Sequence, residues 1–175
     1  MRIDKKQELV FKETIKRVGV MKTIDPEFKR EVAGCPGGEN IMRCFACGTC
    51  VLSCPVSEVT AEYSPRKIIH MILLGMKDEV LGSEAIWYCM TCYRCHVRCP
   101  QDVKYPEIMR VLRKLAVEQG YVKPGFITAV SEVDTVTQDI RRDMLKRIVE
   151  KRNSITEDDI TEIRNYSKTT GRNHG

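Results

Sequence analysis

The sequence predicts an all-α protein, because helical patterns recur and strand patterns are missing. Segments 65–76 and 106–120 place apolar residues at helical spacing, and each opens at a proline, which is well tolerated in the first helical turn. Gly75 and Gly82 lie around the end of the first of these helices. Between residues 44 and 100 no stretch alternates apolar and polar side chains, and no Asn-Gly pair marks a hairpin. Helices are therefore expected to form the core.

Two shorter helices are expected beside these. Asp25-Pro26 precedes a helix over residues 27–33 that ends at Gly34, and Ser83 caps a second helix over residues 84–90.

The two ends of the chain have a different character. Residues 137–152 carry apolar residues at helical spacing among many charges, and Thr156 with Asp159 resembles a capping box that opens a second helix. The last residues, 168–175, are expected to be disordered. Residues 4–18 fit either an amphipathic helix or a strand, and a binding arm is one interpretation.

Two copies of one cysteine pattern dominate the chain, over residues 44–55 and 89–100. Each copy reads C-x2-C-x2-C-x3-C-P, the run by which bacterial-type ferredoxins bind 4Fe–4S clusters. Two copies in register, each followed by a proline, predict two such clusters between short helices, as in an α-helical ferredoxin.

In this run the first three cysteines ligate one cluster and the fourth ligates the other. The ligands expected for cluster 1 are Cys44, Cys47, Cys50 and Cys99. The ligands expected for cluster 2 are Cys89, Cys92, Cys95 and Cys54. This crossing makes the two clusters close neighbours, so the chain is expected to conduct electrons.

Other interpretations of the cysteines fit less well. Zinc ribbons use pairs of cysteines, whereas these are triplets with an added Cys-Pro. Cys92, Cys95 and His96 match the haem attachment motif, but the first run has Val51 in place of the histidine. Disulfides would leave one of the nine cysteines over. Cys35, outside both runs, is expected to be an unliganded thiol.

Composition narrows the class of protein. The 175 residues carry a formal charge of +5, but eight thiolates remove eight charges and two oxidised clusters restore four, which leaves about +1. No basic run interleaves with aromatics, so nucleic acid is not expected as a partner. The first residues lack the apolar core of a signal peptide, so no signal peptide is expected, and the longest apolar stretch, 68–74, is too short to cross a bilayer. A cytoplasmic protein without membrane insertion is expected.

Three parts of the chain follow from these patterns. Residues 1–34 are expected to form an N-terminal arm with a short helix, residues 35–123 the α-helical ferredoxin domain, and residues 124–175 a helical extension with a disordered end. No serine–histidine–aspartate grouping, carboxylate pair or phosphate-binding loop is recognisable, so no catalytic residue is expected.

Residues 25–123 resemble a known family beyond the cysteine runs. Gly38 to Cys50 (GENIMRCFACGTC), Ser64 to Lys67 (SPRK) and Trp87 to Cys95 (WYCMTCYRC) look like the iron–sulfur C subunit of heterodisulfide reductase. The resemblance implies an electron-relay subunit of the methanogenesis complex that reduces the mixed disulfide of coenzyme M and coenzyme B.

The same resemblance implies the partners. In that family, the relay receives electrons from the flavin-containing subunit, which a hydrogenase or formate dehydrogenase supplies. It passes them to the catalytic subunit, where CCG motifs hold the catalytic clusters. This chain has no adjacent cysteines, so bond chemistry is expected on another chain.

Two alternatives remain open. The chain could be the iron–sulfur relay of another dehydrogenase, of the glycolate, glycerol-3-phosphate or succinate type. It could also be a soluble ferredoxin carrier, although a carrier is expected to be smaller and acidic, without a charged helical tail.

Overall fold

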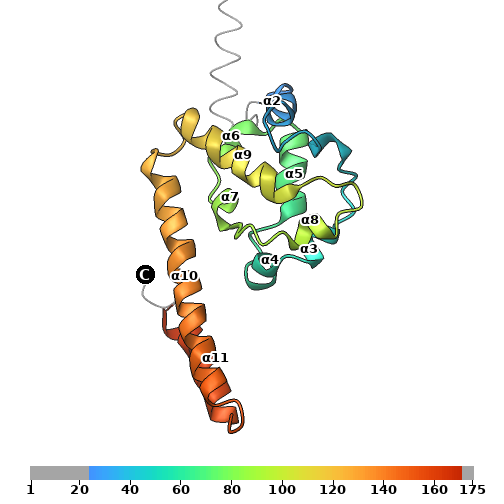
Figure 1. Cartoon of the computed structure of the whole chain (residues 1–175). Coiled ribbons are helices and arrows are strands. Elements are labelled where there is room, and N and C mark those ends of the chain that lie inside the picture. Colours follow the sequence, from blue (N-terminus) through green and yellow to red (C-terminus); the bar gives the residue numbers. More distant parts are fainter. Residues whose placement is uncertain (1–23, 171–175) are drawn as a thin grey trace, which may run out of the picture. The chain divides into compact units, whose positions relative to one another are not determined.

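A computed structural model describes the backbone of residues 24–170 and the side chains through residue 165 (Figure 1). The expected helix or strand over residues 4–18 lies outside the described residues. The chain divides into two compact units, one through Phe126 and one from Ile127. The division at residues 34/35 and 123/124 stays a prediction.

The first unit is helical, and residues 24–126 contain no strand, which confirms the predicted fold class. Its helices are short, and several lie within or beside the cysteine runs. In chain order they are α2 (Phe28–Gly34), η1 (Ile41–Arg43), α3 (Thr49–Leu52), α4 (Pro55–Val59), α5 (Pro65–Leu73), α6 (Lys77–Leu81), α7 (Ala85–Tyr88), α8 (Arg94–Val97) and α9 (Tyr105–Glu118).

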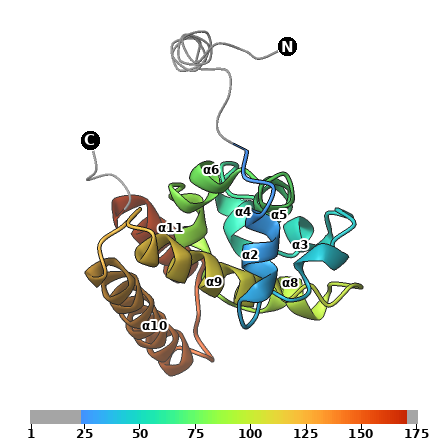
Figure 2. The same cartoon turned by 90° about the horizontal axis from the view of Figure 1, so that it is seen from above.

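Helices α5 and α9 supply half of the buried residues of the hydrophobic core. α5 begins as the sequence predicts, because Ser64 Oγ accepts a hydrogen bond from the Lys67 N–H at 3.4 Å. α9 buries one face along its length, and α2, α6, α7 and α8 all contact it. Figure 2 shows α2 beside α5 at this core, in agreement with their contacts. The buried residues of α9 are Tyr105, Pro106, Ile108, Met109, Val111, Leu112, Leu115 and Ala116.

Several helix limits differ from the prediction. α5 ends at Leu73 because Gly75 takes a left-handed conformation (φ +78°), and the unpredicted helix α6 follows before Gly82. α7 covers only Ala85–Tyr88, because the chain turns extended at Cys89.

The predicted proline positions also differ in detail. Asp25-Pro26 forms a turn before α2, in which the Asp25 carboxylate accepts from the Glu27 N–H at 2.9 Å. Pro55 follows the last cysteine of the first run and is also the first residue of α4.

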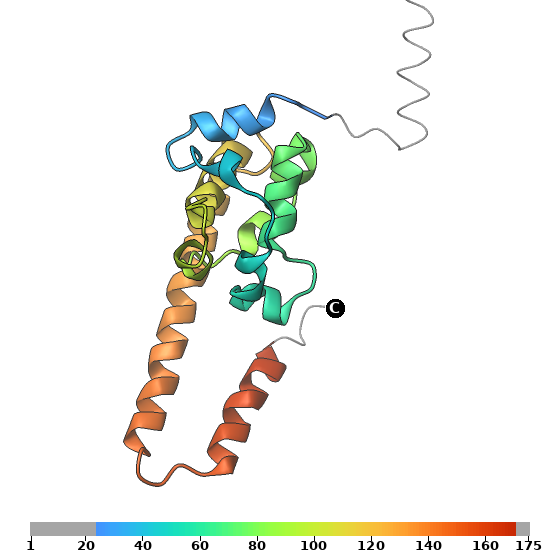
Figure 3. The same ribbon diagram turned by 90° about the vertical axis from the view of Figure 1, so that its right-hand side faces the viewer.

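The second unit is a helical hairpin formed by α10 (Gly125–Glu150) and α11 (Glu157–Thr170), and α11 returns beside α10 (Figure 3). The first two residues of α10 still belong to the first unit. The capping box is confirmed, because Asp159 accepts from the Thr156 N–H at 2.9 Å and the Asp159 N–H donates to Thr156 Oγ1 at 3.4 Å. α10 begins twelve residues before the predicted position 137. Residues 168–170 are helical where disorder was predicted, and residues 171–175 lie outside the described part.

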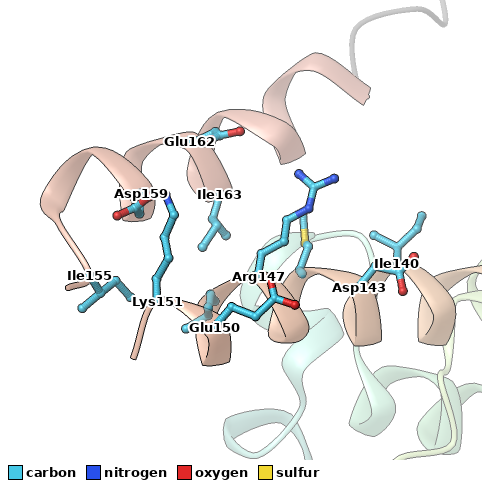
Figure 4. Close-up of a pocket in the computed structure, with 11 residues that line it drawn as sticks. Ile140, Asp143, Arg147, Glu150, Lys151, Ile155, Asp159, Glu162 and Ile163 are labelled. Carbon is cyan, nitrogen blue, oxygen red and sulfur yellow. Dashed lines mark hydrogen bonds and ion pairs between the residues drawn. The ribbon is translucent and has the colours of Figure 1, made fainter. Parts of the chain in front are cut away.

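A cavity lies between the two helices of this hairpin (Figure 4). Its floor is apolar and includes Ile140, Ile148 and Ile163, while Lys151 and Asp159 pair at its rim. No cysteine or histidine lines it among the described residues. In the described part of the chain, no helix has both the length and the apolar character needed to cross a membrane.

Candidate metal centre

The two cysteine runs adopt the same backbone conformation. Ala46 and Gly48 flank the second cysteine of the first run with φ of +59° and +84°. Thr91 and Tyr93 flank the second cysteine of the other run with φ of +46° and +61°. Left-handed residues on both sides of one cysteine reverse the chain tightly, and three of these four are not glycine. Backbone strain of this kind concentrates at functional sites.

After each reversal the chain forms a single helical turn, α3 in the first run and α8 in the second. These turns carry the third cysteines, Cys50 and Cys95, and the two helices contact each other. Figure 1 shows α3, α4 and α8 together at one end of the first unit.

A first cavity, here called the first site, lies within this end. Three cysteines of the first run and two of the second line it. They are Cys44, Cys47, Cys50, Cys95 and Cys99. Ile69 and Val103 add apolar walls, and the Val103 N–H donates to Cys99 Sγ at 3.5 Å.

A second cavity, the second site, is bounded by three cysteines of the second run and one of the first. They are Cys54, Cys89, Cys92 and Cys95. Cys54 is 8% exposed and lies only four residues after Cys50, yet it faces the ligands of the second run. The eight predicted ligands therefore gather around two cavities, and Cys35 lines neither of them in the described part of the chain.

The two sites adjoin each other. Cys95 and Tyr105 line both cavities, so one wall is shared. Cys95 is 8% exposed at this wall, whereas Cys47 and Cys92, the second cysteines of the two runs, are exposed. Each site is thus buried on the side of the shared wall and reaches the surface at its own exposed cysteine.

The electrostatics of the cavities suit a cationic core. Burial, together with the thiolates of Cys44 and Cys47, raises the pKa of Cys50 to about 11. Burial, together with the thiolates of Cys89 and Cys92, raises the pKa of Cys95 to about 12. Sulfurs crowded in this way become ligands only when bound iron compensates their charge and their protons leave.

The exposed ligand of the first site behaves differently. Cys47 Sγ lies 3.4 Å from Thr49 Oγ1, and the hydroxyl and N–H of Thr49 lower the pKa of the Cys47 thiol. Hydrogen bonds of this kind to ligand sulfurs are among the features that set cluster potentials.

Two buried tyrosines were missed by the sequence analysis. The hydroxyls of Tyr63 and Tyr105 lie 3.0 Å apart, and Tyr63 lines the second cavity with Cys89 and acts to lower the pKa of the Cys89 thiol, against the larger effect of burial. A ligand thiolate only accepts hydrogen bonds, so with a cluster bound Tyr63 would donate toward Cys89 and would accept from Tyr105. Burial raises the pKa of both tyrosines, which keeps both donors protonated. Nothing in the sequence places residues 63 and 105 together.

Arg113 was also missed, because it lies within the apolar pattern of α9. Its guanidinium donates to the carbonyls of Ile86, Trp87 and Cys89 at 2.9, 3.2 and 2.5 Å. These bonds satisfy the carbonyls at the end of α7 and hold the loop that presents Cys89.

Comparison with known proteins agrees with this geometry. Residues 40–103 match the model of the 4Fe–4S dicluster domain family. The chain carries a 4Fe–4S dicluster domain. The two cysteine-lined cavities fall in this segment and its edges, and the domain binds two 4Fe–4S clusters.

The most similar relatives include chains of one kind of complex. The chain is 49% identical over 87 residues to the CoB–CoM heterodisulfide reductase iron-sulfur C 2 subunit of Methanocaldococcus jannaschii, covering 47% of this chain and 46% of that protein. It is 39% identical over 102 residues to the C subunit of the H(2):CoB-CoM heterodisulfide,ferredoxin reductase of Methanothermobacter thermautotrophicus, covering 58% and 54%. A third relative, the C2 subunit of the H(2)/formate:CoB-CoM heterodisulfide,ferredoxin reductase of Methanococcus maripaludis, is 49% identical over 92 residues, covering 52% and 49%.

The predicted resemblance to the C subunit of heterodisulfide reductase is therefore confirmed. The chain spans about half the length of these curated relatives.

Proposed function

We propose that this chain is the electron-relay subunit of a cytoplasmic heterodisulfide reductase complex. It would take electrons from the flavin-containing subunit, which a hydrogenase or formate dehydrogenase supplies, and pass them to the CCG-motif subunit. The latter would then reduce the heterodisulfide of coenzyme M and coenzyme B. The observation that carries this proposal is the pair of adjoining cavities, each lined by cysteines of both runs.

The ligand assignment is part of the proposal. In it, Cys44, Cys47, Cys50 and Cys99 bind the cluster of the first site, and Cys89, Cys92, Cys95 and Cys54 bind that of the second. This crossing is supported by the cavity linings: Cys99 lines the first cavity with the first three cysteines of the first run, and Cys54 lines the second cavity with the first three cysteines of the second run.

The residues of the two sites would have different roles in the relay. Bound clusters supply one-electron chemistry. The cysteines would hold two such groups against one shared wall, which Tyr105 also lines. Thr49 hydrogen-bonds the Cys47 sulfur at the first site, and Tyr63 would donate to the Cys89 sulfur at the second. Cys47 and Cys92 bring the two ends of this arrangement to the surface.

Anaerobic co-purification tests the function. We expect the full chain to carry about eight irons and eight sulfides. We also expect it to purify with a flavoprotein and a CCG-motif chain. Stable association with a different dehydrogenase would instead support the alternative relay, and a monomer that reduces many acceptors would support a soluble carrier.

The tyrosine pair yields a prediction on the reduction potential. Tyr63→Phe should lower the midpoint potential of the second-site cluster by roughly 40 mV, because a hydrogen bond of about 1 kcal/mol that favours the more negative reduced state is lost. An EPR-monitored redox titration of the reconstituted protein measures this shift.

Two further variants make the result specific. Tyr105→Phe should give a smaller shift in the same direction, since Tyr105 acts through Tyr63. Tyr121→Phe removes a hydroxyl that donates to Asp78 and should leave both potentials unchanged. Equal shifts in Tyr63→Phe and Tyr121→Phe would contradict the role given to Tyr63.

A further inference from the structure

A groove opens on the surface next to the exposed ligand of the first site. It has a volume of about 640 Å³ and is formed by the loop and helix after Cys47 and by one side of α5. Leu52 and Leu74 lie on it and are 84% and 57% exposed. Exposed apolar residues grouped around a hollow are typical of protein-binding surfaces.

The charges of this groove all have one sign. The charged residues that line it are Arg66 and Lys67, both exposed, and none of the described residues that line it is acidic. A surface of this kind attracts an acidic partner and orients it during encounter.

Arg66 connects the groove to the first site. It lines both the groove and the first cavity, and its Nη1 lies close to the backbone of Gly48, 3.6 Å from where a Cβ would stand. Its positive charge also acts on the Cys47 thiol. A carboxylate that docked against Arg66 would therefore lie within reach of the ligands of the first site.

We propose that this groove is the docking surface for an acidic face of a redox partner chain, which exchanges electrons at the first site. The inference rests on the relay function proposed above and adds to it the face and the charge of the partner. Leu52 and Leu74 would supply apolar contact at the rim, while Lys67 and Arg66 would pair with carboxylates.

Lys67→Glu is the variant that tests the charge of the groove. Lys67 lines the groove but neither cluster cavity. A glutamate three residues after Ser64 completes a capping box at the start of α5, so the helix should be at least as stable. The matched control is Lys114→Glu, the same charge change at an exposed position of α9 outside the groove.

Titration calorimetry at low and high salt measures the binding of the reconstituted full chain to its partner chains. The flavoprotein and the CCG-motif protein are titrated separately. Lys67→Glu should raise the dissociation constant for one of the two roughly threefold to tenfold at low salt, and the difference should shrink as salt is added. Lys114→Glu should bind as the wild type does.

Each outcome decides a different question. If the wild type binds and Lys67→Glu binds equally well, or if both variants weaken binding equally, the groove is not the docking surface, and the relay function stands. If the wild type binds neither partner chain, the relay function itself is wrong, and the partner inferred for the groove is wrong with it. EPR spectra of each variant, unchanged from the wild type, show that both clusters are in place.

Discussion

Cys54→Ala should remove the cluster of the second site and leave that of the first. Cys54 lies four residues after Cys50 in sequence, but its side chain is buried against Cys89, Cys92 and Cys95. Iron should fall from about eight to about four atoms per chain, with a matching loss of acid-labile sulfide. The EPR signal that remains should be the one that Cys99→Ala abolishes.

The control for this prediction is Cys35→Ala. Cys35 is half-buried but lines neither cavity in the described part of the chain, so its loss should leave the iron content unchanged. Selective loss of the first-site signal in Cys54→Ala would show that the fourth ligand of each run is not exchanged between the two clusters.

Gly38→Ala should destabilise the fold strongly. A Cβ at this position would lie 1.9 Å from the backbone oxygen and 2.8 Å from the carbonyl carbon of Val32, distances that no side-chain adjustment relieves. The chain turns back tightly here after α2, and the Gly38 N–H donates to the Cys35 carbonyl at 2.9 Å. Moving this turn would displace the segment that leads to Cys44.

We expect a loss of about 2–4 kcal/mol in the free energy of unfolding, which lowers the apparent melting temperature by roughly 10 °C. Circular dichroism under anaerobic conditions measures it, and iron analysis reports whether the first site is weakened as well.

Gly34→Ala is the matched control. A Cβ at Gly34 would meet nothing within 4 Å. Gly34 lies in the last turn of α2, where alanine has a higher helix propensity than glycine. Its melting temperature should be equal to or slightly above that of the wild type. If Gly38→Ala had the same melting temperature as Gly34→Ala, the prediction would be wrong, because the turn after α2 would then accommodate a Cβ by shifting.

Local signals in the sequence were sufficient for much of the fold. Ser64-Pro65 opens α5, Gly120 follows α9, and Thr156 with Asp159 opens α11, because caps and prolines act within three or four residues. Helix ends were less accurate. The start of α10 at Gly125 and the separate helix α6 depend on weak local preferences that packing overrides.

The sequence by itself determined the chemistry of the sites, since the spacing of the two cysteine runs specifies the ligand type and the number of clusters, and predicts the exchange of Cys54 and Cys99. Only the tertiary structure decided what surrounds them. Tyr63 and Tyr105 meet across 42 residues, and Arg66 reaches both the groove and the first cavity. Such contacts arise when distant helices pack against one core, and the spacing of residues along the chain carries no record of them.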